Sequence, residues 1–386
     1  MQSDSAGSFL TSPALDIDAI LSDPGIRIVV CCGAGGVGKT TTAAALALRA
    51  AERHGRRTVV LTIDPARRLA QSLGLTELDN TPKPVKGVQT DQGELHAMML
   101  DMKRTFDEVV LTHTDPAKAE EIFANPFYQA MSSTFSGTQE YMAMEKLGQL
   151  RARDAWDLIV VDTPPSRSAL DFLDAPARLS RFLDGKMLRL LLAPARAGGR
   201  SVFSLVSASF GVFSRTVTKI LGTQLLTDLS GFVGALDSMF GGFRERADQT
   251  YRILQARETA FLVVAAPEPD AIREATYFAG RLAAERMPLA GLVLNRVTEV
   301  GAPAITAAAA RAAAVALDDV GDAKTTAEVL RVHADLMDQR ARQTGVAQRF
   351  EQACPGVPVI AVAAQPADVH DVDGLRVIGS ALGATG

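Results

Sequence analysis

Residues Gly33–Thr41 read GAGGVGKTT and have the types and spacing needed to hold a phosphorylated ligand. In a glycine-rich turn between a strand and a helix, backbone N–H groups can point inward and cradle phosphate oxygens. Lys39 would then reach the β- and γ-phosphates of a nucleotide, and the Thr40 hydroxyl would bind the bridging magnesium ion. The residues expected to form this phosphate loop are Gly33, Gly35, Gly36, Val37, Gly38, Lys39, Thr40 and Thr41.

The same glycines also fit a different pattern. Gly33, Gly35 and Gly38 match GxGxxG, which is typical of dinucleotide-binding folds. A plain glycine-rich turn without a ligand is a third interpretation. Lys39 and Thr40 directly follow the last of these glycines, and a cation beside a hydroxyl is what a site for phosphate and magnesium needs. This pair favours the phosphate loop.

Two aspartates lie further along the chain, each at the end of an apolar run. Asp64 lies in TIDPARRL, where Pro65 stops the preceding strand, and Asp162 lies in LIVVDTPPS. Each aspartate alone is more simply explained as a strand-end or helix-capping residue. Together with a phosphate loop, Asp64 is expected to orient the attacking water and Asp162 to contact magnesium through a water. Lys39 and Asp64 are thus the predicted catalytic residues.

Short apolar runs alternate with helical patterns, as repeated βαβ units require. Near-continuous apolar strands suit a parallel sheet that is covered on both faces. We therefore predict an α/β fold of the P-loop NTPase type: a doubly wound, mostly parallel sheet with helices on both faces. Its ligands should bind at the carboxyl ends of the strands. The predicted strands are residues 26–32, 58–63, 95–100, 158–162, 261–266, 291–295 and 358–363.

Two long segments interrupt this alternation. Residues 103–153 and 170–254 have helical patterns and are too long for simple crossovers. We expect a flexible N-terminal segment at 1–24 and one P-loop domain at 25–386, into which these segments insert as a helical subdomain. The second segment has apolar residues at helical spacing, and they would form either a buried face, the interpretation we favour, or an exposed groove. These residues are Val202, Val206, Phe210, Phe213, Val217 and Ile220.

The composition indicates a globular protein that does not bind nucleic acid. Of 386 residues, 47% are hydrophobic and 5% aromatic, which suits a sizeable core of Ala, Val and Leu. The formal net charge of -4 offers no basic footprint for nucleic acid. The first residues do not read as a secretion signal, and apolar runs stay shorter than the ~20 residues that span a bilayer. We expect a cytoplasmic protein.

The cysteines predict neither a disulfide framework nor a metal site. Cys31, Cys32 and Cys354 are few and irregularly spaced, without the paired spacing of zinc or iron–sulfur ligands. Cys31 and Cys32 end a predicted buried strand, so we interpret them as small core residues.

The motifs above occur in the order seen in ArsA-type ATPases, which the chain resembles from about Ile26 to about Leu382. The resemblance rests on GAGGVGKTT, TIDPARRL, SGTQEYMAMEKL, VVDTPPSRSALDFL and GLVLNRV. This family includes the arsenite-pump ATPase and the guided-entry ATPase for tail-anchored membrane proteins. The resemblance implies a dimer that binds ATP and Mg²⁺ near the subunit interface and that opens and closes with ATP binding and hydrolysis.

The resemblance also implies roles for individual residues. Asp64 would orient water in switch I, and Asp162 would lie in switch II near magnesium. Asn295 would hydrogen-bond the adenine ring, with Arg296 beside it. Pro366 would belong to the loop that closes over the base, which reads QPADVHDVDGL.

One departure from the family concerns the phosphate loop. ArsA-type loops, a deviant form of the Walker A motif, usually read GKGGVGKTT, and their early lysine reaches across the dimer to the partner's nucleotide. This chain has Ala34 at that position. Because alanine cannot stabilise phosphate charge in trans, we favour a hetero-oligomer with a lysine-bearing paralogue over a homodimer. In the alternative, Arg67 or Arg68 supplies the charge, or hydrolysis is slow.

Other departures from the family argue against a zinc-linked dimer and against arsenite binding. Ser166, Arg167 and Ser168 stand where relatives often carry a Gly-His pair, and the zinc-binding cysteine pair and the arsenite-type cysteine cluster are missing.

The favoured function is an ATP-binding and ATP-hydrolysing subunit, with a hydrophobic protein cargo or a membrane-protein partner. One alternative is a regulatory subunit that binds ATP with little hydrolysis. A MinD- or ParA-like positioning ATPase would need a basic patch or tail, and the C-terminal VDGLRVIGSALGATG has a single cation.

Overall fold

The computed structural model describes most of the chain on either side of a long central gap. The described residues are 12–63, 68–126, 128–129, 132, 138–164, 245–318, 320 and 323–383. Asp64, Arg67, the segment 166–168 and the apolar positions at 202–220 therefore lie outside the described residues.

An eight-stranded sheet with the order β3-β4-β2-β5-β1-β6-β7-β8 organises the structure. All pairings are parallel except that of β3 with β4. β1 lies between β5 and β6, so the strand that leads into GAGGVGKTT is central. The predicted α/β fold is confirmed. The strands are β1 (Ile28–Cys32), β2 (Arg57–Thr62), β3 (Lys83–Pro84), β4 (Glu94–Met99), β5 (Leu158–Asp162), β6 (Thr259–Ala265), β7 (Leu289–Val297) and β8 (Val359–Ala363).

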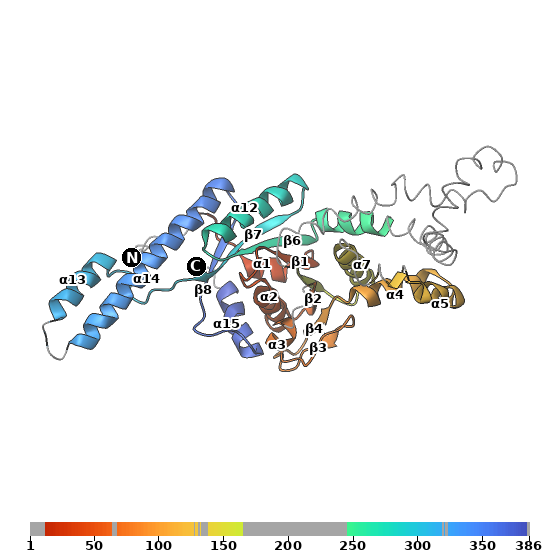
Figure 1. Cartoon of the computed structure of the whole chain (residues 1–386), viewed down its shortest axis with the longest axis horizontal. Helices are drawn as coiled ribbons and strands as arrows, with labels where there is room; N and C mark the ends of the chain where they lie inside the picture. The colour runs from red at the N-terminus through yellow and green to blue at the C-terminus, as the bar shows by residue number, and fades with distance from the viewer. Residues whose placement is uncertain are drawn as a thin grey trace, which may run out of the picture. The chain divides into compact units, whose positions relative to one another are not determined.

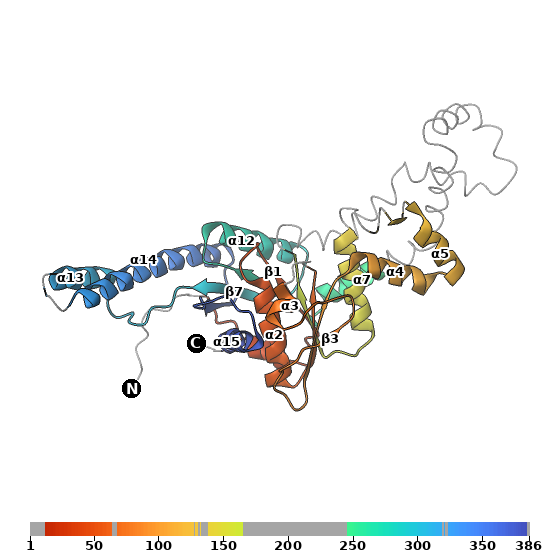
Figure 2. The same cartoon turned by 60° about the horizontal axis from the view of Figure 1, so that its bottom comes forward.

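Helices cover both faces of this sheet. Figures 1 and 2 show α2 and α15 on one face and α12 on the other. Among the described helices, none is both long enough and apolar enough to traverse a bilayer. The helices around the sheet are α1 (Ile17–Ser22), α2 (Lys39–His54), α3 (Arg68–Ser72), α12 (Pro269–Ala284), α13 (Ala307–Leu317), α14 (Lys324–Ala353) and α15 (Val372–Gly383).

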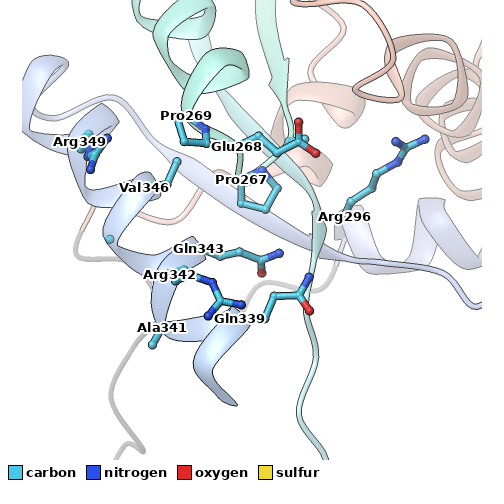
Figure 3. A pocket seen from close by; sticks show the side chains of 12 residues that line it. Pro267, Glu268, Pro269, Arg296, Gln339, Ala341, Arg342, Gln343, Val346 and Arg349 are labelled. Carbon is cyan, nitrogen blue, oxygen red and sulfur yellow. The ribbon is translucent and has the colours of Figure 1, made fainter. Parts of the chain in front are cut away.

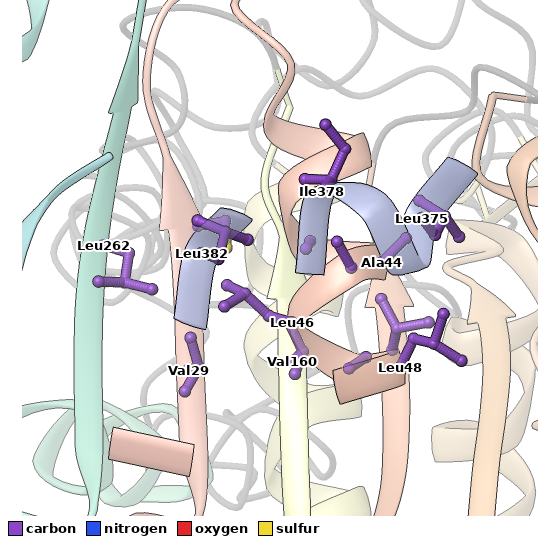
Figure 4. Close-up of a cluster of buried hydrophobic side chains, with 14 of the residues drawn as sticks. Val29, Ala44, Leu46, Leu48, Val160, Leu262, Leu375, Ile378 and Leu382 are labelled. Carbon is purple, nitrogen blue, oxygen red and sulfur yellow. The ribbon is translucent and has the colours of Figure 1, made fainter. Parts of the chain in front are cut away.

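The main core lies between the sheet, α2 and α15 (Figure 4). Alanines such as Ala43 and Ala47 are fully buried on α2 and let this helix approach the strands closely. Leu375 and Leu382 of α15 are also fully buried and pack into the same cluster. Each such leucine stabilises the fold by about 1.5–3 kcal/mol through burial. This packing holds the first turn of α2 beside the end of β1.

The chain divides into two compact units. One comprises Met1–Met99, Arg153–Leu170 and Ile253–Gly386, and the other comprises Leu100–Ala152 and Asp171–Arg252. The bounds of the inserted helical subdomain stay a prediction. The helices of the second unit with given bounds are α4 (Met102–His113), α5 (Pro116–Ala124) and α7 (Thr138–Ala152).

Buried ion pairs join the helices of the second unit. Lys146 of α7 donates to Glu108 of α4 over 2.9 Å, and the Lys146 side chain is only 4% exposed. Arg246 contacts Glu145 at 3.0 Å, and the Glu145 side chain is also 4% exposed. The unit thus places charged residues inside a helical core, where each depends on its partner.

α13 and α14 form an antiparallel hairpin within the first unit, and they lie side by side in Figures 1 and 2. Thr306 begins α13, its hydroxyl accepting from Ala309 N–H at 3.2 Å. The second helix, α14, is 30 residues long, and its C-terminal half buries Phe350 and Ala347.

Candidate functional site

The phosphate loop connects β1 to α2. Two of its glycines lie too close to neighbouring atoms to carry a side chain. A Cβ at Gly33 would lie 2.0 Å from the Val264 carbonyl oxygen. Gly38 has φ +94°, and a Cβ there would lie 2.2 Å from Nδ2 of Asn295. Residues with a side chain rarely adopt such a left-handed backbone conformation. Glycine is therefore required at Gly33 because of the limited space, and at Gly38 because of both space and conformation.

Lys39 is the first residue of α2 and is only 6% exposed. Its Nζ donates to the Ala34 carbonyl oxygen at 2.6 Å, so the lysine folds back over the loop. An ammonium group held there is available to an anion that replaces the carbonyl. The Ala34 side chain is 9% exposed and packs with the hydrophobic core.

A fully buried carboxylate lies at the next strand end. Oδ2 of Asp162, which is 0% exposed, accepts hydrogen bonds from the Thr40 hydroxyl at 2.8 Å and the Thr62 hydroxyl at 2.9 Å. The pairing of β2 with β5 sets Thr62 opposite Asp162. This combination of one carboxylate and hydroxyl oxygens suits a hard cation such as Mg²⁺. Sequence reasoning missed Thr62, because its contact depends on strand register.

Asn295 reaches the phosphate loop from β7. Its Nδ2 donates to the Val37 carbonyl oxygen at 2.9 Å. The register of β7 against β8 shifts between Leu294 and Val297, and Arg296 in this bulge has φ +61°. The bulge re-aims side chains at the strand end. Lys39, Thr40, Asp162 and Asn295 are thereby gathered at the carboxyl edge of the sheet.

The loop predicted to close over a base connects β8 to α15. Pro366 is exposed in this loop, and the Gln365 amide donates to the Ala363 carbonyl at 3.2 Å. Further along, the Val369 carbonyl accepts from the Ser72 hydroxyl at 3.5 Å. This contact links the loop to α3, the helix that follows the predicted switch I.

Cys31 and Cys32 lie within β1 and are buried. Burial, and then the nearby Asp162 carboxylate, raise the pKa of the Cys31 thiol far above its usual range. Burial raises the pKa of Cys32 to about 12. Protonated, buried thiols are poor nucleophiles and poor metal ligands, in keeping with their interpretation as core residues.

A pocket of about 700 Å³ lies beside the bulge of β7, between the loop that follows β6 and the helix α14 (Figure 3). Of its lining residues, only Arg296 was expected at a site. The other lining residues come from segments that carry no recognisable motif. They are Ala266, Pro267, Glu268, Pro269, Gln339, Ala341, Arg342, Gln343, Gly345, Val346 and Arg349.

Comparison with protein families gives a match to the model described as anion-transporting ATPase, over residues 26–314. An uncharacterized protein of Streptomyces coelicolor is 30% identical over 284 residues, which cover 72% of this chain and 64% of that protein. A putative arsenical pump-driving ATPase of Prosthecochloris vibrioformis is 30% identical over 159 residues, covering 40% of this chain and 37% of the relative. The ATPase GET3B of Arabidopsis thaliana is 24% identical over 308 residues, covering 74% and 68%.

Proposed function

Because this chain belongs to the family of anion-transporting ATPases, we propose that it is an ATP-binding and ATP-hydrolysing subunit of an ArsA-type dimer whose conformational cycle is coupled to nucleotide turnover. The observation that carries the proposal is the arrangement of Lys39, Thr40 and Asp162. The Lys39 ammonium rests on the phosphate loop itself, and the Thr40 hydroxyl bonds to the buried Asp162 carboxylate.

Each of these residues has a defined part in the proposal. The loop N–H groups bind the phosphates, and Lys39 leaves the Ala34 carbonyl to contact the terminal phosphates. Thr40 and Asp162 would hold magnesium, which offsets phosphate charge when it is bound. Thr62 keeps the Asp162 carboxylate oriented through its hydroxyl. Asp64, outside the described residues, is proposed to orient the attacking water.

The proposed partner is a paralogue that carries the lysine missing at Ala34. The Ala34 side chain is nearly buried and uncharged, so it supplies no cation to the nucleotide of a facing subunit. In a dimer of identical chains, both nucleotide sites would lack this charge. A lysine-bearing paralogue would complete the site of this chain.

Ala34 also supports a second candidate function, that of a regulatory subunit. With alanine at position 34, the chain can bind ATP through Lys39 and leave most of the hydrolysis to its partner. In that case it is a regulatory subunit.

Steady-state ATP hydrolysis separates these functions. We expect little turnover by the purified chain alone and strong turnover after co-expression with an ArsA-type paralogue encoded beside it. Lys39→Ala should abolish that gain, because the phosphates lose their cation, and Lys86→Ala should not, because Lys86 is an exposed lysine away from the loop. Strong turnover by the chain alone would refute the need for a paralogue. Nucleotide binding without turnover in either sample would indicate the regulatory subunit.

A further inference from the structure

The pocket beside β7 is lined by more cations than anions. Arg342 and Arg349 come from α14, and Arg296 comes from β7. Among the described residues, none of these three arginines takes part in an ion pair. By contrast, Arg311 and Arg331 on the same hairpin are bonded to aspartates. Among the described residues that line the pocket, Glu268 is the one with a carboxylate.

The glutamine side chains of the pocket can donate hydrogen bonds, which also favours a ligand with many hydrogen-bond acceptors. Gln343 is 9% exposed, and its Oε1 accepts from the Thr298 N–H at 2.8 Å. Because that bond fixes the amide, its N–H groups are the part left for a ligand. Figure 3 shows Gln339, Arg342 and Gln343 extending from α14 on the side that faces Arg296.

The start of α12 adds to the same electrostatic pattern. This 16-residue helix begins at Pro269 in the pocket wall, and Glu268 at its N-cap makes no side-chain capping bond. The N-terminal end of a helix carries the positive end of its dipole, which favours anions. A pocket of about 700 Å³ is the size that takes a small organic molecule.

The end of β7 contacts both the phosphate loop and the pocket. Asn295 donates to the Val37 carbonyl, the adjacent Arg296 lines the pocket, and Thr298 is bonded to Gln343 of α14. A ligand that contacts Arg296 in this pocket therefore acts on the strand end that supports the loop.

We propose that this pocket is an effector site for a small polyanion that carries phosphate or carboxylate groups, and that its occupation changes the rate at which nucleotide leaves the phosphate loop. The guanidinium groups recognise the anion through charge-assisted hydrogen bonds. The effector role rests on the proposed nucleotide function, whereas binding of the anion does not.

Binding is tested by equilibrium dialysis of labelled pyrophosphate and, separately, citrate against the full-length Lys39→Ala protein, whose phosphate loop is disabled. We expect one probe to bind saturably. The pair Arg342→Gln and Arg349→Gln should weaken its binding by about tenfold or more, because it removes charged donors. The control pair Arg53→Gln and Arg257→Gln removes the same charge from exposed arginines elsewhere and should leave binding unchanged.

Absence of saturable binding for both probes, or an equal loss in the control pair, would overturn the anion site. The effector role is read from the release of fluorescent ADP from the wild-type protein during a chase with excess unlabelled ADP. The bound probe should change the release rate by about twofold or more, but not in the Arg342→Gln, Arg349→Gln protein. An unchanged rate would overturn the effector role. If fluorescent ADP fails to bind, or binds equally to Lys39→Ala, the proposed nucleotide function fails while the dialysis result stands.

Discussion

Asn295 was expected to contact the adenine ring, but in the structure its side chain supports the phosphate loop. The resemblance implies that it binds adenine, yet in the structure its Nδ2 donates to the Val37 carbonyl inside the phosphate loop. The close approach is possible because Gly38 has no Cβ in its path. This hydrogen bond supports the phosphate loop directly.

We expect Asn295→Ala to weaken the binding of tripolyphosphate, which has no base, as well as that of ATP. One lost hydrogen bond of about 0.5–1.5 kcal/mol corresponds to roughly two- to twelvefold in affinity. Competition against fluorescent ADP measures both ligands in the same samples. If tripolyphosphate affinity is unchanged while ATP affinity falls, Asn295 contacts only the base and does not support the loop.

The cysteines give a second prediction for individual residues. Cys31 and Cys32 are buried, whereas Cys354 is half-buried and has a pKa that burial raises above its ordinary value. Iodoacetamide should therefore modify Cys354 slowly in the native protein, faster as the pH rises, and should reach Cys31 and Cys32 only in denaturant. Mass spectrometry of the labelled peptides provides the measurement. Native labelling of Cys31 would show that β1 opens.

At the scale of the elements, α1 is fastened to α2 by one carboxylate. Asp18 accepts from Arg49 at 2.6 Å and lies 2.9 Å from the His54 ring. The hydrogen bonds from Arg49, opposed by partial burial and assisted by His54, lower the pKa of Asp18 from 3.8 to about 2. Because the folded pKa is depressed, this stabilisation is present above pH 3.8 and is lost as the pH falls toward 2.

Asp18→Asn should therefore lower stability at neutral pH and have a much smaller effect near pH 2. The Asp18 side chain is 35% exposed, so solvent screening limits the change to at most about 1 kcal/mol. Urea unfolding at pH 7 and near pH 2 measures it, with the exposed Asp91→Asn as the control. An equal effect at both pH values would mean that the carboxylate charge is not responsible.

The elements differ in how far the sequence predicts them. β1 is buried throughout and mostly apolar, and β2 and β5 have apolar centres (Val59–Leu61 and Leu158–Val161), so the hydrophobic pattern locates these strands. β3 was missed, because Lys83 and Pro84 carry no apolar pattern. α14 was missed because its N-terminal half exposes Val329 (61%) and Val332 (58%), which blurs a single buried face.

The candidate site was predictable to the extent that it is local in sequence. The phosphate loop is contiguous, and its glycines are required by backbone conformation, so a motif can identify it. The bond from Thr62 to Asp162 depends on strand register, and that from Gln343 to Thr298 depends on how α14 packs. Such contacts arise from tertiary structure and leave no short pattern.

At the scale of the whole molecule, each compact unit depends on different interactions. The first packs apolar side chains between sheet and helices, and its buried Lys39 and Asp162 bond to neutral groups, whereas the buried Lys146 and Glu145 of the second pair with oppositely charged side chains. Removing one partner of a buried pair is costly because the other charge is left behind.

We expect Lys146→Met to destabilise the second unit by about 2 kcal/mol, less than a fully buried pair would lose, because the Glu108 side chain is 33% exposed and can hydrate. Hydrogen exchange should rise in α4 and α7 and stay unchanged in β1 and β6. The exposed Lys118→Met is the control. Equal loss of protection in both units would show that they unfold as one.

The length of α14 places its first residue far from the point where the helix contacts the end of β7. Gln343 of α14 is bonded to Thr298, the residue after β7, and Lys324 at the start of the helix lies 19 positions before Gln343, which is about 28 Å. A rotation of about 10° at Gln343 carries Lys324 through about 5 Å by this geometry. For any such rotation of a straight helix, the far end at Lys324 moves much farther than the residues that contact Thr298.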